Sequence, residues 1–512
     1  MIATSRSLAL YGIDAYPVEV EADVSTGLPT FTIVGLPDSA VRESKQRIQS
    51  ALHNIGVRLP GKKITVNMAP AGRKKEGPGF DLPIAVSILS ALGVVPAGSV
   101  SRRFFIGELA LDGTLRPVRG MLPMSDRARR EQHSGLVVPR GNSREAAVPG
   151  GQNVYPVDDL VEVIGFLKGE IDLEPALFRW EWNEDAPDNL PDFEDVRGQE
   201  SAKRALEVAA AGGHNILMVG PPGSGKTMLA KRISSILPPL TPEEAIETTK
   251  IHSVAGLLAP DGSLVCSRPF RAPHHTVSDA GLIGGGTVPG PGEVSLAHNG
   301  VLFLDELPEF RRNVLEVLRQ PLEDGKVTIT RAAMTTTFPA DFMLAAAMNP
   351  CPCGYLTDPS HSCNCTGPKV QRYLERISGP LLDRIDIHVD VAPVGYDDLS
   401  SDLPTGEPSS DIRRRVVRAR KIQLARFRAV SGVYCNGGMT TSMVREFCPL
   451  DDKGKALLKS AMELYGFSAR AYDRIVKVSR TIADLTGSAD IGSEHLAEAV
   501  QYRSVTSGTY FG

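Results

Sequence analysis

The sequence predicts an α/β protein in three parts: an N-terminal α/β domain, a central domain built on a parallel sheet, and a C-terminal helical domain. Two observations carry this prediction. Up to about residue 395, short apolar strands alternate with amphipathic helices, and a glycine-rich turn joins one strand to a helix. From residue 411 onward the pattern predicts helices. We place the three domains at 1–170, 196–395 and 396–512, with a linker at 171–195.

Length and composition exclude some classes of protein. A chain of 512 residues should hold about three domains. Its 42% hydrophobic and 23% charged residues are typical of globular proteins, and the net charge of −4 gives no global argument for binding nucleic acid. No apolar run approaches the roughly 18–20 residues of a membrane span, and the N-terminus lacks the pattern of a signal peptide. We therefore expect a cytoplasmic protein with no membrane partner.

The N-terminal domain, residues 1–170, shows strand and helix patterns in alternation. β-Branched and alternating segments predict strands, and the helix that follows the second strand begins with a capping aspartate, Asp38. The expected strands are 18–24, 30–34, 64–67 and 104–107, and the expected helices are 38–52 and 82–92.

Three segments of this domain, 75–81, 107–113 and 115–121, resemble the proteolytic domain of Lon. That family uses a serine and a lysine, a nucleophile with its base within hydrogen-bond reach. The resemblance would place the serine at Gly79 and the lysine near residues 121–123, which are Met, Leu and Pro. It therefore implies a Lon-like fold without the dyad and without proteolysis, kept for assembly or for holding a ligand.

Residues 171–195 have the composition of a linker. They contain Trp180, Trp182, three prolines and a run of acidic residues. A helix over 202–211 then leads into the next strand.

The central domain carries a G-x-x-x-x-G-K-[ST] motif in a strand–turn–helix context. The strand is 215–219, and the helix after the motif has apolar residues at 229, 233, 236 and 237. Backbone N–H groups of such a loop, together with a helix N-terminus, surround phosphate groups. The motif predicts an ATP site in which Lys226 reaches the β- and γ-phosphates and Thr227 binds Mg²⁺. The loop residues are Gly220, Pro221, Pro222, Gly223, Ser224, Gly225, Lys226 and Thr227.

A second apolar strand, 301–306, ends in two acidic residues. Asp305 is expected to hold Mg²⁺ with Thr227, and Glu306 to polarise the attacking water. Acids at a strand end are also found as helix caps. The strand 342–348 ends at Asn349, whose amide would contact the γ-phosphate or the water, although asparagine is common at strand ends.

Two further segments of the central domain are candidates for binding a substrate. Residues 251–299 form a long insert rich in glycine and proline that contains Arg268, Arg271, His274 and His275, and long loops in compact domains are usually functional. Residues 325–338 predict a projecting β-hairpin that carries Lys326 and Arg331.

The order of these motifs, ending in Leu381-Leu-Asp-Arg-Ile-Asp386, resembles an AAA+ ATPase. The hairpin and the insert are similar to the branch that contains magnesium chelatase and minichromosome-maintenance helicases. The resemblance implies that Arg384 is an arginine finger acting on a neighbouring subunit, which requires an oligomer, and that Arg470 touches the γ-phosphate. An ion pair with Asp383 or Asp386 is the alternative for Arg384, and Arg376 is the other finger candidate.

Four cysteines lie close together as C-x-C-x₉-C-x-C, with His361 among them. Two close pairs of thiolates suit a tetrahedral structural Zn²⁺, which would hold a loop beside the ATP site. A metal-free loop and a redox or iron–sulfur role remain alternatives. The cysteines are Cys351, Cys353, Cys363 and Cys365.

The helix predicted at 411–428 carries eight basic residues from 413 onward. They would either form a solvated helix face or lie near nucleic acid phosphates.

The combination of domains resembles the YifB/ComM family along essentially the whole chain. Its specific features are the Lon-like domain, the segment 349–354 (NPCPCG) and the ending Ser479–Leu485. The resemblance implies a magnesium-chelatase-like, hexameric, ATP-driven helicase. Such a helicase would act on DNA without sequence preference and promote branch migration during recombination of incoming DNA in natural transformation.

Rival functions belong to other classes. A chelatase subunit would need partner subunits, and its ATPase activity would be indifferent to DNA. A protein-remodelling ATPase would act on protein clients only, and an ATP-dependent protease is disfavoured by Gly79 and Leu122.

Overall fold

The structure, a computed structural model, describes residues 1–59, 61–131, 135–179, 190–259, 264–286, 289–331, 334–358, 360–393, 406–430 and 432–509. The chain forms two compact units. Unit 1 comprises Met1–Trp182 and Pro242–Val265, and unit 2 comprises Asn183–Thr241 and Cys266–Gly512. Unit 1 is therefore discontinuous in sequence, because a segment that follows the phosphate-loop helix belongs to it.

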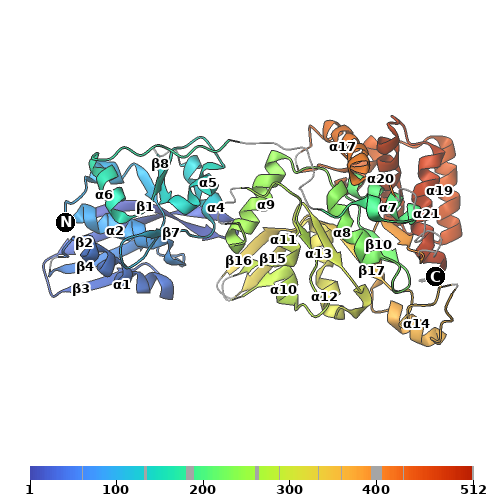
Figure 1. The fold of residues 1–512 in the computed structure, drawn as a ribbon, viewed down its shortest axis with the longest axis horizontal. Helices are drawn as coiled ribbons and strands as arrows, with labels where there is room; N and C mark the ends of the chain where they lie inside the picture. Colours follow the sequence, from blue (N-terminus) through green and yellow to red (C-terminus); the bar gives the residue numbers. More distant parts are fainter. Residues whose placement is uncertain are drawn as a thin grey trace. The chain divides into compact units, whose positions relative to one another are not determined.

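Unit 1 is built on a seven-stranded mixed sheet in the order β3-β4-β2-β1-β5-β8-β9. The long pairs β1–β2 and β2–β4, labelled in Figure 1, are antiparallel. Strands β5, β8 and β9 run parallel to one another. The strands are β1 (Ile2–Tyr11), β2 (Asp14–Ser25), β3 (Thr30–Val34), β4 (Lys63–Ala69), β5 (Arg103–Phe105), β8 (Gly135–Pro139) and β9 (Val154–Val157).

Helices cover this sheet, and the most deeply buried is α2 (Asp81–Ala91), every residue of which is buried. Helix α1 begins after Asp38, whose carboxylate accepts a hydrogen bond from the N–H of Val41 at 2.8 Å. Such a cap satisfies a backbone donor that the first turn leaves free. The other helices of at least nine residues in unit 1 are α1 (Ser39–Asn54), α4 (Met121–Arg130), α6 (Leu160–Lys168) and α9 (Pro242–Ala255).

Helix α9 lies in the second sequence segment of unit 1, Pro242–Val265. It packs against α4, where the backbone oxygen of Ser253 accepts a hydrogen bond from the N–H of Gly120 at 3.2 Å. The Ser253 hydroxyl donates to the buried carboxylate of Glu145, and Lys250 pairs with Asp126 at 2.8 Å. The contact with Gly120 lies at the start of α4, where the Lon resemblance would place a lysine.

Unit 2 contains a five-stranded parallel sheet in the order β11-β14-β17-β10-β18. Parallel sheets are covered on both faces, so their central strands are apolar throughout. Every residue of β10, β14 and β17 is buried accordingly. The strands are β10 (Ile216–Val219), β11 (Phe270–Arg271), β14 (Val301–Leu304), β17 (Met343–Met348) and β18 (Ile387–Asp390).

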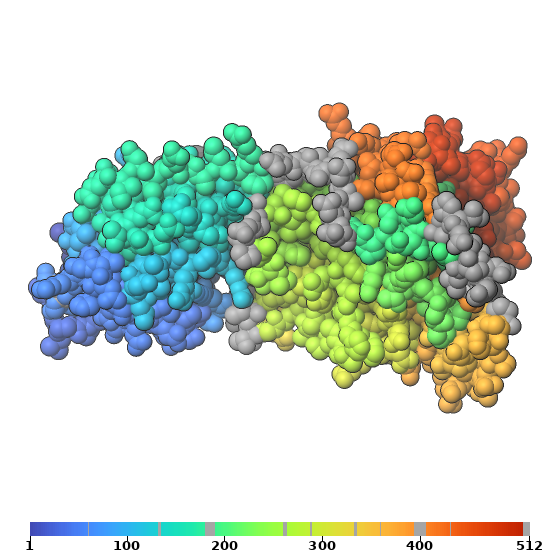
Figure 2. Space-filling model, in the orientation of Figure 1, coloured from blue at the N-terminus to red at the C-terminus, as the bar shows by residue number. Residues whose placement is uncertain are grey.

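Helices complete unit 2, and one hydrophobic core runs from the sheet through the C-terminal helices. Residues of these C-terminal helices, orange and red, lie side by side on the face shown in Figure 2. A separate hairpin pairs β15 (Lys326–Arg331) with β16 (Met334–Pro339). The principal helices are α7 (Glu200–Gly212), α8 (Lys226–Ile236), α13 (Arg319–Asp324), α14 (Gly367–Leu374), α15 (Gly379–Leu382), α17 (Ser409–Arg426), α18 (Thr441–Phe447), α19 (Asp452–Tyr465), α20 (Ala469–Thr486) and α21 (Ser493–Thr509).

The predicted fold class is confirmed: the protein is α/β, with a parallel-sheet core and a helical C-terminal region. Strand β1 was missed because its core face is polar in part. Ser5 and Ser7 are fully buried, and the Ser5 hydroxyl donates to Pro83 O at 2.8 Å. Among the helices of the described residues, none is long and apolar enough to cross a bilayer. Residues 180–189, with both tryptophans of the expected linker, lie outside the described residues.

The basic helix expected at 411–428 is α17. Several of its arginines are buried or bind groups within the protein. Arg413 and Arg420 are buried, and Arg420 donates to the carbonyls of Ala210 and Ala211 on α7. Arg415 pairs with Glu207 and Glu407. Both interpretations of this helix were therefore wrong for these three arginines, because Arg413 is buried and because Arg415 and Arg420 join α17 to α7.

Candidate nucleotide site and cysteine cluster

The carboxyl ends of three parallel strands bring the predicted site residues to one edge of the sheet. Strand β10 leads into the phosphate loop, β14 into Asp305 and Glu306, and β17 into Asn349. The register places Val219 beside Met348, and Leu304 beside Ala346. Ligands of open α/β sheets bind at this edge.

The phosphate loop turns on two glycines with left-handed backbones, Gly223 (φ +78°) and Gly225 (φ +90°). Helix α8 begins directly at Lys226, so its N-terminus faces the loop. The Lys226 ammonium donates to the carbonyls of Gly220 and Pro221, each at 2.8 Å. Burial lowers the pKa of Lys226 to about 8, against the smaller opposing effect of Asp305.

The side chains of Thr227 and Asp305 lie next to each other, as they must if both are to bind one Mg²⁺ ion. The threonine hydroxyl donates to the Asp305 carboxylate at 2.6 Å. A hydroxyl and a carboxylate oxygen are ligands of the type that Mg²⁺ prefers. The pair therefore fits the ion, and neither residue is used as a helix cap. Asn349 completes this corner, since its amide oxygen lies 3.3 Å from the Lys226 nitrogen.

Glu306 occupies an unusual conformation beside this pair. Its backbone is left-handed, with φ 53°. Its side chain is 58% exposed, and a carboxylate oxygen lies 3.6 Å from Nδ1 of His275. The His275 ring in turn lies 4.0 Å from the ring of His274 and 6.4 Å from that of Phe310, measured between centroids. Sequence reasoning identified His275 as part of the insert but did not predict its contact with Glu306.

The predicted arginines lie apart from the loop. Arg384 is buried and pairs with Glu323 of α13, while its Nη1 donates to Pro380 O at 2.7 Å. The alternative interpretation of Arg384, an ion pair with Asp383 or Asp386, is therefore wrong. Asp386 instead pairs with Arg474, and Asp383 lies 3.5 Å from Arg503.

The charges of both predicted arginines, Arg384 and Arg470, act on the carboxylate of Glu323. A hydrogen bond from Arg384 and its charge, with further contributions from Arg470 and Arg319, lower the pKa of Glu323. Arg470 is exposed at the start of α20. Arg376, the other finger candidate, is half exposed and pairs with Glu309 at 3.0 Å.

The four clustered cysteines offer sulfur atoms that all lie within 4.8 Å of one another. The Sγ–Sγ distances are 3.3 Å for Cys351–Cys353, 3.5 Å for Cys353–Cys363 and 3.7 Å for Cys351–Cys363. Four thiolates about 2.3 Å from one zinc ion would stand at nearly this spacing. His361 pairs with Asp358 at 3.0 Å. The residues fit a four-cysteine zinc site.

Three family models match the chain in sequence. Residues 20–142 match subunit ChlI of Mg-chelatase, residues 192–399 match magnesium chelatase, subunit ChlI, and residues 406–503 match the C-terminal part of that subunit.

Whole-length relatives are also known. The chain is 44% identical over 507 residues to competence protein ComM of Haemophilus influenzae, covering 98% of each chain. It is 42% identical over 500 residues to the uncharacterized protein YifB of Escherichia coli, covering 97% of this chain and 96% of YifB. The magnesium-chelatase 67 kDa subunit of Chlorobaculum tepidum is 29% identical over 164 residues, which is 31% of this chain and 23% of that subunit.

Proposed function

The chain belongs to the YifB/ComM family of magnesium-chelatase-like AAA+ ATPases, and from this premise we propose that it is an ATP-driven motor acting on DNA. Its specific task would be branch migration during recombination of incoming DNA in natural transformation. The observation that carries the proposal is the assembly of Lys226, Thr227 and Asp305 at the strand ends, in a chain similar along its length to a competence protein.

The chemistry assigns one role to each residue. Lys226 and the loop N–H groups bind the phosphates, and Thr227 and Asp305 hold Mg²⁺, which supplies charge neutralisation. Glu306 orients and polarises the attacking water. Asn349, within reach of Lys226, responds to the γ-phosphate, as Arg470 would from the helical region.

Assembly completes the proposed site. We propose a cytoplasmic homo-oligomer, a hexameric ring, in which Arg384 reaches the ATP of a neighbouring subunit after leaving Glu323. Arg376 is the exposed alternative. The hairpin 325–338 and the insert 251–299 would contact the DNA backbone, and such binding weakens steeply with salt. Residues 260–263, 287–288 and 332–333 of these segments lie outside the described residues.

The decisive experiment is branch migration on four-way DNA junctions, with DNA-stimulated ATP hydrolysis measured in parallel. The wild-type chain should migrate junctions at low salt. Lys226→Ala should fail to bind nucleotide, and Glu306→Gln should bind ATP but hydrolyse it about 100-fold more slowly or worse. Equal activity in all three proteins would rule out the motor.

The same assay separates the rival functions. ATP hydrolysis that is indifferent to DNA, together with a requirement for partner subunits, would favour a chelatase subunit. Hydrolysis stimulated by unfolded protein would favour a remodelling ATPase.

A further inference from the structure

We propose that the cysteine cluster is a structural zinc site that holds the phosphate loop in shape, so that nucleotide affinity depends on zinc. This inference rests on the proposed function, because it concerns the same ATP site. We call the described residues of 351–365 the cysteine loop. Its four thiolates would bind one Zn²⁺, with release of the protons that the thiols carry.

The cysteine loop touches the phosphate loop at one glycine. Gly354 has a left-handed backbone, with φ +87°. A Cβ built on it would fall 2.4 Å from Cδ and 2.6 Å from Cγ of Pro222, the third residue of the phosphate-loop motif. The Gly354 N–H donates to Cys351 O at 2.9 Å, which closes the turn that contains Cys353. The backbone between two ligands therefore packs directly on the Pro222 ring.

A second contact lies on the other side of the cluster. Asn349 precedes Cys351 by two residues, and its amide oxygen lies 3.3 Å from the Lys226 nitrogen. Tyr373 of α14, whose side chain is buried, has its hydroxyl near the backbone of Asn349. The cysteine loop is thus anchored between two groups that reach the nucleotide site.

Little else holds the cysteine loop in place. Cys351 is fully buried, but most of the described side chains from 352 to 365 are exposed or half-buried. A loop with so little apolar burial does not repay the entropy of ordering its backbone. A metal ion bound by four of its residues can offset this entropy cost, because the free energy of metal binding at structural zinc sites contributes to folding.

The first test measures zinc and nucleotide binding on the full chain. Purified protein should hold one zinc ion per chain by elemental analysis. Removing it with a chelator under reducing conditions should weaken binding of a fluorescent ADP analogue about ten- to a hundredfold, the cost of displacing groups that position a ligand. Adding zinc back should restore the affinity.

Two glycine variants separate the contact from the metal. Gly354→Ala should keep zinc but weaken ADP binding, since its Cβ meets Pro222. Gly487→Ala at the end of α20 is the matched control, because Gly487 also has a left-handed backbone (φ +76°) and a Cβ there meets nothing within 4 Å. The double variant Pro222→Ala, Gly354→Ala should bind ADP more tightly than Gly354→Ala alone, because removing the ring makes room.

Either of two results would overturn the inference: a chain that binds no zinc, or a zinc-free chain with unchanged ADP affinity. Neither result would contradict the proposed function if Lys226→Ala still abolishes nucleotide binding. If Gly354→Ala fails to fold, the zinc-removal measurement decides alone.

Discussion

Glu306 is one of four described non-glycine residues with a left-handed backbone. A left-handed conformation costs a residue with a side chain about 1–3 kcal/mol and persists only where the surroundings impose it. In this chain it brings the carboxylate next to His275, whose ring is in contact with His274 and Phe310. The insert therefore supplies a side chain that orients the group expected to polarise water.

Replacing this histidine tests the orientation. His275→Ala should lower kcat for ATP hydrolysis about tenfold or more, because a general base must be held within reach of its water. Nucleotide affinity should stay the same, since Lys226 and Thr227 are untouched. His274→Ala is the control, because its Nδ1 faces Thr276 Oγ1 at 3.0 Å instead. A loss of ADP affinity in His275→Ala, or equal losses of kcat in both variants, would contradict this role.

The sequence alone predicts that these motifs meet, because each motif begins where a strand of the parallel sheet ends. Parallel pairing then brings Thr227, Asp305 and Asn349 together whatever the rest of the chain does. The partners of Arg384 and Glu306 could not be foreseen. Glu323 and His275 come from segments whose position depends on tertiary packing, and no local pattern encodes it.

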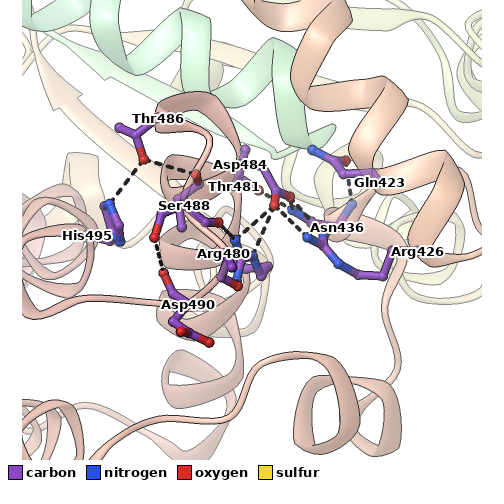
Figure 3. A network of polar contacts seen from close by, with 12 residues as sticks. Gln423, Arg426, Asn436, Arg480, Thr481, Asp484, Thr486, Ser488, Asp490 and His495 are labelled. Carbon is purple, nitrogen blue, oxygen red and sulfur yellow. Dashed lines mark hydrogen bonds and ion pairs between the residues drawn. The ribbon is translucent and has the colours of Figure 1, made fainter.

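Secondary-structure elements are joined by a buried polar network in the helical region (Figure 3). Asp484 of α20 is fully buried and accepts hydrogen bonds from Arg426 Nη1 at 2.8 Å, Arg480 Nε at 3.1 Å and Asn436 Nδ2 at 2.8 Å. One carboxylate thus balances two guanidinium groups on different helices. In isolation neither arginine would be tolerated at this depth.

Asp484→Ala should therefore cost about 3–5 kcal/mol in the free energy of unfolding, because it leaves two buried cations without their partner. Urea-induced unfolding of the full chain measures the loss. Glu463→Ala provides the comparison, since Glu463 and Lys459 form an exposed pair at 4.0 Å on α19, and its stability should not change measurably. Similar stability of the two variants would show that the network is dispensable.

The contact between α9 and α4 gives a pH-dependent prediction. Burial alone would raise the pKa of Asp126, but the hydrogen bond and charge of Lys250, with Arg130 and Arg129, outweigh burial and lower the pKa. The folded chain therefore keeps this carboxylate ionised to lower pH than the unfolded chain, in which its pKa is about 3.9. The resulting stability is present above about pH 4 and is lost as the pH falls through the folded-state value.

Lys250→Met should cost about 2 kcal/mol of stability near pH 7, the range for a hydrogen bond between charged groups. The difference from the wild-type chain should shrink as the pH drops below about 4. Thermal melting across this pH range measures it, and Lys455→Met, which removes an exposed pair with Asp452, is the control. A penalty that is the same at every pH would point to lost packing instead of lost charge.

The two-unit organisation of the whole molecule leads to a prediction about fragments. Residues 1–179 lack α9, which supplies the partners of Gly120 and Asp126 and a hydrogen bond to Glu145. This fragment should melt at a lower temperature than the same fragment joined by a flexible linker to residues 242–259. Equal melting temperatures would mean that α9 adds no stability to unit 1.

For the whole molecule, the sequence indicated the fold class of the domains. It did not indicate which structural unit each segment belongs to. The segment 242–265 follows the phosphate-loop helix directly, and its helical pattern is as compatible with unit 2 as with unit 1. Only the polar partners on α4 and the buried face of α9 place it in unit 1. Those partners lie more than 100 residues upstream.

The discontinuity of unit 1 also sets the order of events during synthesis. Helix α4 is translated well before α9, and β10, the phosphate loop and α8 are translated between them. The surface of α4 that α9 covers must remain open throughout that interval, and unit 1 can be completed only after the phosphate loop has emerged. A nascent chain that stalls before residue 242 would therefore leave this surface of α4 uncovered.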